Sequence, residues 1–220
     1  MSYAGCIFDL DGTLADTLHS IAWFGNGALQ AFGFPAIPVM EYKQMVGNGA
    51  DLLIRRMLAR VDASLPEGEI RRFRAEYDRR YADDPMALVG AYPGLPDLLG
   101  YLHGKGLKLG VLSNKPDDMT RAIAGELYGD VLDLIQGQRE GVPTKPDPTA
   151  LLAMAEALGL APADILSIGD SGVDMDTGRN AGMDACGVLW GFREEAELVE
   201  HGAKYLASDP TQLQKIIEKR

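Results

Sequence analysis

The sequence has few of the residues that define disulfide-rich proteins or histidine-based metal sites. Its 220 residues include two cysteines, Cys6 and Cys186, and both lie in apolar, strand-like stretches. We interpret them as small buried side chains in a reducing compartment, which argues against a disulfide framework or a cysteine nucleophile. The three histidines are scattered along the chain without the spacing of metal ligands. A site built on histidine is therefore not expected.

Positive charge and long apolar stretches are also scarce. The 21 Lys and Arg residues face 32 Asp and Glu residues, and the formal net charge of −11 argues against nucleic acid or an anionic membrane as a general partner. No apolar stretch approaches the roughly 20 residues that cross a bilayer, and Met1 to Gly5 leave no room for a signal peptide before the first expected strand. We expect a cytoplasmic protein, either a monomer or a homodimer.

The chain is organised around its first apolar stretch. Residues 6–8 are typical of a short buried strand, and Asp9 and Asp11 follow at alternate positions, with a turn at Gly12 and Thr13. In an open parallel α/β sheet, ligands bind at the carboxyl edge of the strands, which is where these acids would lie. Two carboxylates so close together repel each other unless a cation or a shared proton separates them. The pair therefore indicates metal-assisted chemistry or a division of roles between the two acids.

The remaining hydrophobic pattern predicts an α/β protein with a helical insert. Residues 17–85 show helical periodicity and no convincing strand, whereas helices and strands alternate after residue 93, as in a parallel sheet with right-handed crossovers. We predict a Rossmann-like core made of residues 1–16 and 86–220, with residues 17–85 inserted as an α-helical unit. A helix over residues 148–158 is expected to have Asp147 as its N-cap. Further strands are expected near residues 107–113, 132–135, 165–170, 185–189 and 204–207.

Three more groups of polar residues lie at expected strand ends or helix starts. Ser113 and Asn114 end one strand, Lys145 precedes a helix, and Asp170 and Asp174 follow another strand. Taken singly, these groups could be a turn, a solvated surface charge and a helix cap. Together they suit one site, because an ammonium beside a helix N-terminus favours a phosphate group and carboxylate oxygens favour Mg²⁺.

The hexapeptide Asp9-Leu10-Asp11-Gly12-Thr13-Leu14 resembles the signature of the haloacid dehalogenase superfamily, in its phosphatase branch. The later groups follow in the family's order, so the resemblance covers almost the whole chain. It implies the haloacid dehalogenase fold with an α-helical cap, and a phosphoryl-aspartate mechanism in which Asp9 is the nucleophile and Asp11 the general acid and base. It also implies Mg²⁺ as the cofactor. The implied phosphate-binding residues are Gly12, Thr13, Ser113, Asn114 and Lys145, and the implied metal ligands are Asp9, Asp11 through its backbone carbonyl, Asp170 and Asp174.

The predicted insert carries the features that bear on the substrate. Residues 46–51 resemble the helical cap of phosphoglycolate phosphatases, although a glycine-rich helix start needed only for packing would have the same composition. Residues 51–80 contain eight arginines against six acids, and a cap arginine would suit a substrate carboxylate, although several of these arginines would pair with acids on solvated helix faces. The cap candidates are Asn48, Gly49, Arg55 and Arg56. The expected substrate is a small anionic phosphate ester, 2-phosphoglycolate.

Other functions are compatible with the same residues. The substrate could be a sugar phosphate, a nucleotide or pyrophosphate, and a β-phosphoglucomutase-like phosphotransferase would use the same groups. A dehalogenase has no use for a second acid, so Asp11 argues against that reaction. A phospho-accepting signalling module also places acids, a hydroxyl and a lysine around Mg²⁺. The large helical insert directly after the first strand favours catalysis on a small molecule instead.

Overall fold

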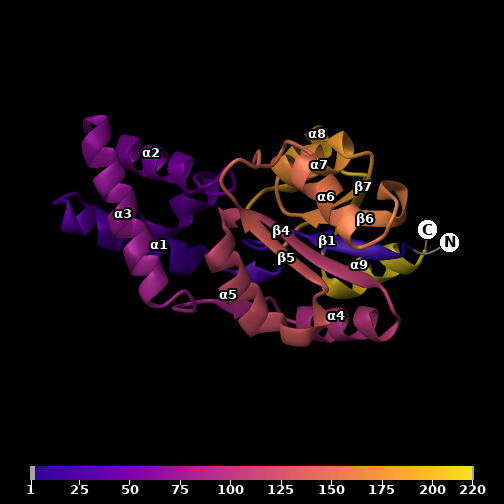
Figure 1. The fold of residues 1–220 in the computed structure, drawn as a ribbon. Coiled ribbons are helices and arrows are strands. Elements are labelled where there is room, and N and C mark those ends of the chain that lie inside the picture. Colours follow the sequence, from indigo (N-terminus) through magenta and orange to yellow (C-terminus); the bar gives the residue numbers. More distant parts are fainter. Residues whose placement is uncertain (1–2, 220) are drawn as a thin grey trace.

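A six-stranded parallel sheet forms the centre of the computed structural model, which describes residues 3–219 (Figure 1). The strand order is β5-β4-β1-β6-β7-β8, and each neighbouring pair is parallel. The strands are β1 (Gly5–Phe8), β4 (Lys108–Pro116), β5 (Leu134–Gln138), β6 (Ile165–Gly169), β7 (Asp184–Val188) and β8 (Tyr205–Ala207). Residues 1, 2 and 220, which belong to the predicted core, lie outside the described residues. The predicted α/β class is confirmed.

The strand order changes direction at β1, which lies between β4 and β6. In the parallel register, Phe8 is opposite Val111 of β4 and Ile168 of β6. The residues that follow these three positions therefore emerge together at one edge of the sheet. This edge, at a change in strand order, is where open α/β sheets bind ligands.

Helices cover both faces of the sheet (Figure 1). On one face lie α6 (Thr149–Ala157), α7 (Gly172–Asn180) and α8 (Glu195–Glu200), and on the other lie α4 (Leu95–Gly104), α5 (Asp117–Tyr128) and α9 (Pro210–Glu218). Ile7 belongs to a core with Leu151 and Met154 of α6, whereas Cys6 and Phe8 belong to the larger core that contains α4 and α9. Because β1 is buried on both faces, its sequence is uniformly apolar and does not alternate.

Between β2 (Ala15–Asp16) and β3 (Gly90–Ala91) the chain forms helices and no sheet strand. These are α1 (Leu18–Ala31), the 3₁₀ helix η1 (Val39–Gln44), α2 (Ala50–Arg60) and α3 (Glu67–Asp83). Figure 1 shows α1, α2 and α3 beyond the end of the sheet, next to β4 and α5. Aromatic contacts hold α1 to α3, with 4.5 Å between the ring centroids of Phe24 and Tyr81 and 5.1 Å between those of Phe32 and Phe73. The predicted helical content of this segment is confirmed, and its division from the core at residues 17 and 85 stays a prediction.

One local feature was not predicted, and one local expectation was wrong. The antiparallel pair β2 and β3, which joins the two ends of the insert, was not expected, because two-residue strands carry no sequence period. Asp147 is not the N-cap of α6; Pro148 occupies that position, and an Asp147 carboxylate oxygen accepts from the Thr149 N–H at 2.9 Å.

Cys6 and Cys186 are buried free thiols, as expected. No helix within residues 3–219 has the length and apolar character needed to span a membrane.

Candidate active site

Asp9, Lys145 and Asp174 meet at the carboxyl edge of the sheet. The Asp9 N–H donates to the carbonyl of Ile168 at 2.8 Å, which fixes the first residue after β1 against β6. The Lys145 ammonium lies 2.9 Å from Asp9 Oδ1 and 2.6 Å from Asp174 Oδ1, and it donates to the Leu112 carbonyl at 3.1 Å. The Lys145 side chain is only 6% exposed, so little water reaches its ammonium group. The two carboxylates are its charged partners.

Asp174 is oriented by the start of α7. Its Oδ2 accepts from the N–H of Ser171 at 3.1 Å and from the Ser171 hydroxyl at 2.6 Å. Ser171 is the N-cap residue and Asp174 the third residue of the helix, so the two form a capping box. Asp174 thus combines the helix-capping role with a contact to Lys145, and both of its oxygens have donors.

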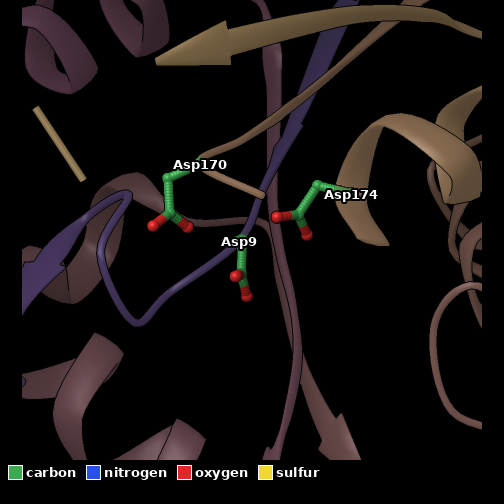
Figure 2. A group of neighbouring side chains, drawn as sticks. All are labelled: Asp9, Asp170 and Asp174. Carbon is green, nitrogen blue, oxygen red and sulfur yellow. The ribbon is translucent and has the colours of Figure 1, made fainter. Parts of the chain in front are cut away.

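Asp170 completes a cluster of three carboxylates. One oxygen from each of Asp9, Asp170 and Asp174 lies within 4.8 Å of the others, and Figure 2 shows the three side chains extending from separate segments into one region. Asp170 Oδ2 accepts from the Phe192 N–H at 2.7 Å, and Asp170 Oδ1 accepts from the Thr13 hydroxyl at 3.3 Å. Such a set of hard oxygen donors could hold a metal ion.

The cluster holds more negative charge than its surroundings neutralise. Burial raises the pKa of Asp9 from 3.8 to about 7. The positive charge of Lys145 opposes this rise, and the negative charges of Asp174 and Asp11 add to it. Burial, with the charges of Asp174 and Asp9, raises the pKa of Asp170 well above its ordinary value. Burial alone would lower the pKa of Lys145, but the two acids beside it raise that pKa overall. A further cation at the cluster would therefore be stabilised.

The turn after Asp9 approaches Asp170 closely. Gly12 has φ of +87°, and a Cβ at this position would lie 2.4 Å from Asp170 Oδ2, so the backbone conformation and the space both favour glycine. The N–H groups of Gly12 and Thr13 donate to the carbonyls of Ala15 and Leu10, at 2.9 and 3.2 Å. Both bonds shape the turn, and the expected role of Gly12 and Thr13 in phosphate binding stays a prediction.

Ser113 and Asn114 occupy the end of β4 beside Lys145. The Ser113 hydroxyl oxygen accepts from the Lys115 N–H at 3.2 Å. The Asn114 side chain accepts from the Lys145 N–H at 2.9 Å and donates to the carbonyls of Lys145 and Gly47, each at 3.1 Å. Asn114 therefore fixes the Lys145 segment and connects it to the insert.

A pocket lies between the acidic edge and the insert, with about 620 Å³ of empty space that is partly open to solvent. Its lining includes Asp9, Asp11, Ser113 and Asp170 from the core. The insert contributes Ile21, Val46, Gly47, Gly49, Ala50, Leu53 and Tyr77. The predicted core residues and the glycine-rich segment of the insert thus face the same space.

The other cap candidates are placed differently. Arg56 donates to the Met45 carbonyl at 2.7 Å and to the Asn48 side-chain oxygen at 3.0 Å, so this pair shapes the segment before α2. Arg55 is half-exposed and forms an ion pair with Glu67 at 2.8 Å. Both arginines therefore have partners within the insert.

Sequence reasoning missed Lys115 and Arg193. The Lys115 ammonium lies 3.2 Å from Asp11 Oδ1 and 4.3 Å from the centre of the Tyr81 ring. The Arg193 guanidinium, which lies in the segment between β7 and α8, donates to the carbonyls of Lys43 and, at 2.7 Å, Val46 in the insert. The position of Lys115 directly after Ser113 and Asn114 was an available signal, whereas nothing in the sequence marked Arg193.

The comparisons with known proteins agree with this geometry. The family model for haloacid dehalogenase-like hydrolases matches residues 6–188. The chain belongs to this family. Among its relatives, the phosphoglycolate phosphatase of Rhodospirillum rubrum is 34% identical over 199 residues, which cover 86% of this chain and 80% of the relative. The phosphoglycolate phosphatase of Escherichia coli K12 is 32% identical over 206 residues, covering 86% and 82%.

Solved structures place the chain in the same family. A candidate phosphoglycolate phosphatase from Lactobacillus delbrueckii subsp. bulgaricus superimposes with a TM-score of 0.93 at 30% identity, over 100% of both chains. A candidate β-phosphoglucomutase from Thermotoga maritima, with a TM-score of 0.72 and 20% identity over 97% and 96%, shares the fold. The haloacid dehalogenase fold and the assignment as a phosphatase are therefore confirmed. The assignment as an enzyme also argues against the phospho-accepting signalling module.

Proposed function

We propose that this phosphatase is a Mg²⁺-dependent hydrolase of a small anionic phosphomonoester, with 2-phosphoglycolate as its substrate and an aspartyl phosphate on Asp9 as its intermediate. The observation that carries the proposal is the position of Asp9, beside the Lys145 ammonium and in the wall of a pocket shared with Asp11 and the insert. The relatives named phosphoglycolate phosphatase support the choice of substrate.

The acidic cluster fits Mg²⁺. Asp9 and Asp170 offer hard oxygen ligands in a site whose raised pKa values indicate a need for positive charge. Asp9, Asp170 and the backbone carbonyl of Asp11 would hold the ion. Asp174 has donors on both oxygens, from Lys145 and Ser171, which favours an indirect role for it. When bound, the ion would neutralise charge on the carboxylates and on the phosphoryl group.

In the proposed reaction, Lys145 and Ser113 hold oxygens of the phosphoryl group while an Asp9 oxygen attacks phosphorus. The new bond from Asp9 to phosphorus forms as the ester bond breaks, and Asp11 gives its proton to the leaving alkoxide. Asp11 then takes a proton from a water molecule that attacks phosphorus. The bond from phosphorus to Asp9 breaks, which releases inorganic phosphate and restores the Asp9 carboxylate.

The insert would act as the cap. Its residues Val46, Ala50 and Leu53 add apolar side chains to the lining of the pocket. Closure of the insert over a bound ester would exclude water from the charged groups. Residues 17–85 are proposed as the cap domain on this basis. The predictions of a cytoplasmic location, of a monomer or homodimer and of no nucleic-acid partner remain predictions from the sequence.

The proposal is tested by comparing kcat/KM for 2-phosphoglycolate with those for sugar phosphates, nucleotides and pyrophosphate, each with and without Mg²⁺. We expect 2-phosphoglycolate to give the highest value and EDTA to abolish turnover. A higher kcat/KM for another ester would show that the proposed substrate is wrong and would identify that ester as the better substrate. Full activity in EDTA would exclude the divalent metal.

A further inference from the structure

Lys115 places a buried ammonium in the pocket that the proposed reaction does not use. Its side chain is 5% exposed, and Nζ lies 3.2 and 3.3 Å from the two carboxylate oxygens of Asp11. The same Nζ lies 4.3 Å from the centre of the Tyr81 ring, which belongs to α3 of the insert. Lys115 is therefore next to the acid assigned to the leaving group, on the side of the pocket where core and insert meet.

The charged side chains that line this pocket differ in how far their donors are engaged. Arg193 is 9% exposed, and its guanidinium is bound to the carbonyls of Lys43 and Val46 and to the carboxylate of Glu197. Lys115 has three N–H donors, and its side-chain partners are the Asp11 carboxylate and Tyr81, which it contacts through the ring face and a side-chain hydrogen bond. An anion that enters beside Asp11 would thus meet an ammonium whose charge faces a single carboxylate.

The lining of the same pocket also contains large apolar side chains, among them Ile21, Leu53, Met119 and Phe192. An anionic group in such surroundings needs a partner of opposite charge, because its burial without one is costly. The arginines expected for this role, Arg55 and Arg56, are held by Glu67 and by the segment before α2. The core lysine is the better placed cation.

We infer that Lys115 binds a carboxylate on the leaving group of the substrate and so selects small phosphate esters with a second negative charge. This inference rests on the proposed function. Lys115 lies within 3.3 Å of both Asp11 oxygens. Because the proposed reaction has Asp11 protonate the ester oxygen, the carboxylate must stand within a few bonds of that oxygen. A phosphorylated 2-hydroxy carboxylate of two or three carbons meets this condition, whereas a sugar phosphate lacks the carboxylate.

The test compares 2-phosphoglycolate with 2-hydroxyethyl phosphate, an ester whose leaving group is of similar size but carries no charge. Para-nitrophenyl phosphate serves as a general phosphatase substrate. Lys115→Met should lower kcat/KM for 2-phosphoglycolate roughly 10- to 100-fold more than for 2-hydroxyethyl phosphate, the range for a buried charge-assisted contact. Lys115→Arg keeps the charge and should retain part of the preference. Lys108→Met, on the same strand but paired with Asp133 at the surface, should leave the ratio unchanged.

An equal loss for both esters in Lys115→Met would overturn the inference, because it would show that Lys115 acts only through Asp11. Turnover of para-nitrophenyl phosphate without any preference for the carboxylate in the unmodified protein would also overturn it. If the unmodified protein hydrolyses none of the three esters, the proposed function fails instead. In that case, calorimetry on the Asp9→Asn background gives the Kd values of 2-phosphoglycolate and 2-hydroxyethyl phosphate without any turnover. Tighter binding of 2-phosphoglycolate that Lys115→Met removes supports the inference. Equal Kd values for the two esters overturn it.

Discussion

Replacing Asp9 by Asn should stabilise the metal-free protein while abolishing its activity. Burial raises the pKa of Asp9 from 3.8 to about 7, so the folded protein at pH 8 holds an ionised carboxylate that would be more stable in the unfolded chain. The difference in pKa corresponds to about 4 kcal/mol at pH 8. At pH 5 only the interval from 3.8 to 5 counts, so the free-energy cost falls to less than half of that value. The neutral amide would remove this cost in free energy. The net gain in stability is smaller by the free energy that the contact between Asp9 and Lys145 contributes.

The assay is urea unfolding in EDTA at pH 8 and pH 5, for the unmodified protein, Asp9→Asn and Asp84→Asn. Asp84 is exposed just after α3, so removing its charge should change the free energy of unfolding by less than about 0.5 kcal/mol. For Asp9→Asn we expect a gain of up to about 4 kcal/mol at pH 8 that shrinks by more than half at pH 5. A variant less stable than the unmodified protein at pH 8, or a gain that does not depend on pH, would refute the reasoning.

Four further substitutions test separate parts of the account. Gly12→Ala should destabilise the fold by about 1–3 kcal/mol in urea unfolding, because φ is +87° and the new Cβ would overlap Asp170. Asn114→Ala should lower the free energy of unfolding by about 2 kcal/mol and reduce kcat, since three hydrogen bonds of the Lys145 segment and the insert are lost; an unchanged kcat would count against its positioning role. Arg193→Met should raise KM more than it lowers kcat, because its bonds to Lys43 and Val46 connect the core to the insert beside the pocket; the opposite split in steady-state kinetics would argue against this. Arg55→Met should leave kcat/KM within about twofold, since the Arg55–Glu67 pair is exposed and such pairs contribute less than about 1 kcal/mol.

The sequence was sufficient for the parts of the site that depend on strand ends. Asp9, Ser113 and Asp170 each follow a short apolar run, and parallel strands bring their carboxyl ends to one edge whatever their order. The position of Lys145 was predicted because the helix after it was recognisable. The roles within the cluster were less accessible: the contact from Lys145 to Asp174 spans 29 residues and depends on the capping box at α7.

The contacts of the arginines in the insert could not be predicted from the sequence. Its helices were predicted from their period, but the direction in which each arginine points depends on packing between helices. Arg56 turns toward the segment before α2 and Arg55 toward Glu67, although the two are neighbours in sequence. The contacts of Lys115 with Asp11, within the core, and of Arg193 with Val46, between core and insert, join residues more than 100 positions apart. Only the folded chain brings these residues together.

The central claim, that Asp9 is the nucleophile of a phosphatase, is tested most directly by rapid-quench mass spectrometry. The protein with Asp11→Asn is mixed with Mg²⁺ and para-nitrophenyl phosphate. Its phenolate leaves without a proton from Asp11, so loss of the base should slow only the breakdown of the intermediate. We predict one phosphoryl group per chain, located on the peptide that contains Asp9. A phosphoryl group on Ser113 or another residue, or a burst of para-nitrophenolate without any phosphorylated peptide, would contradict the account.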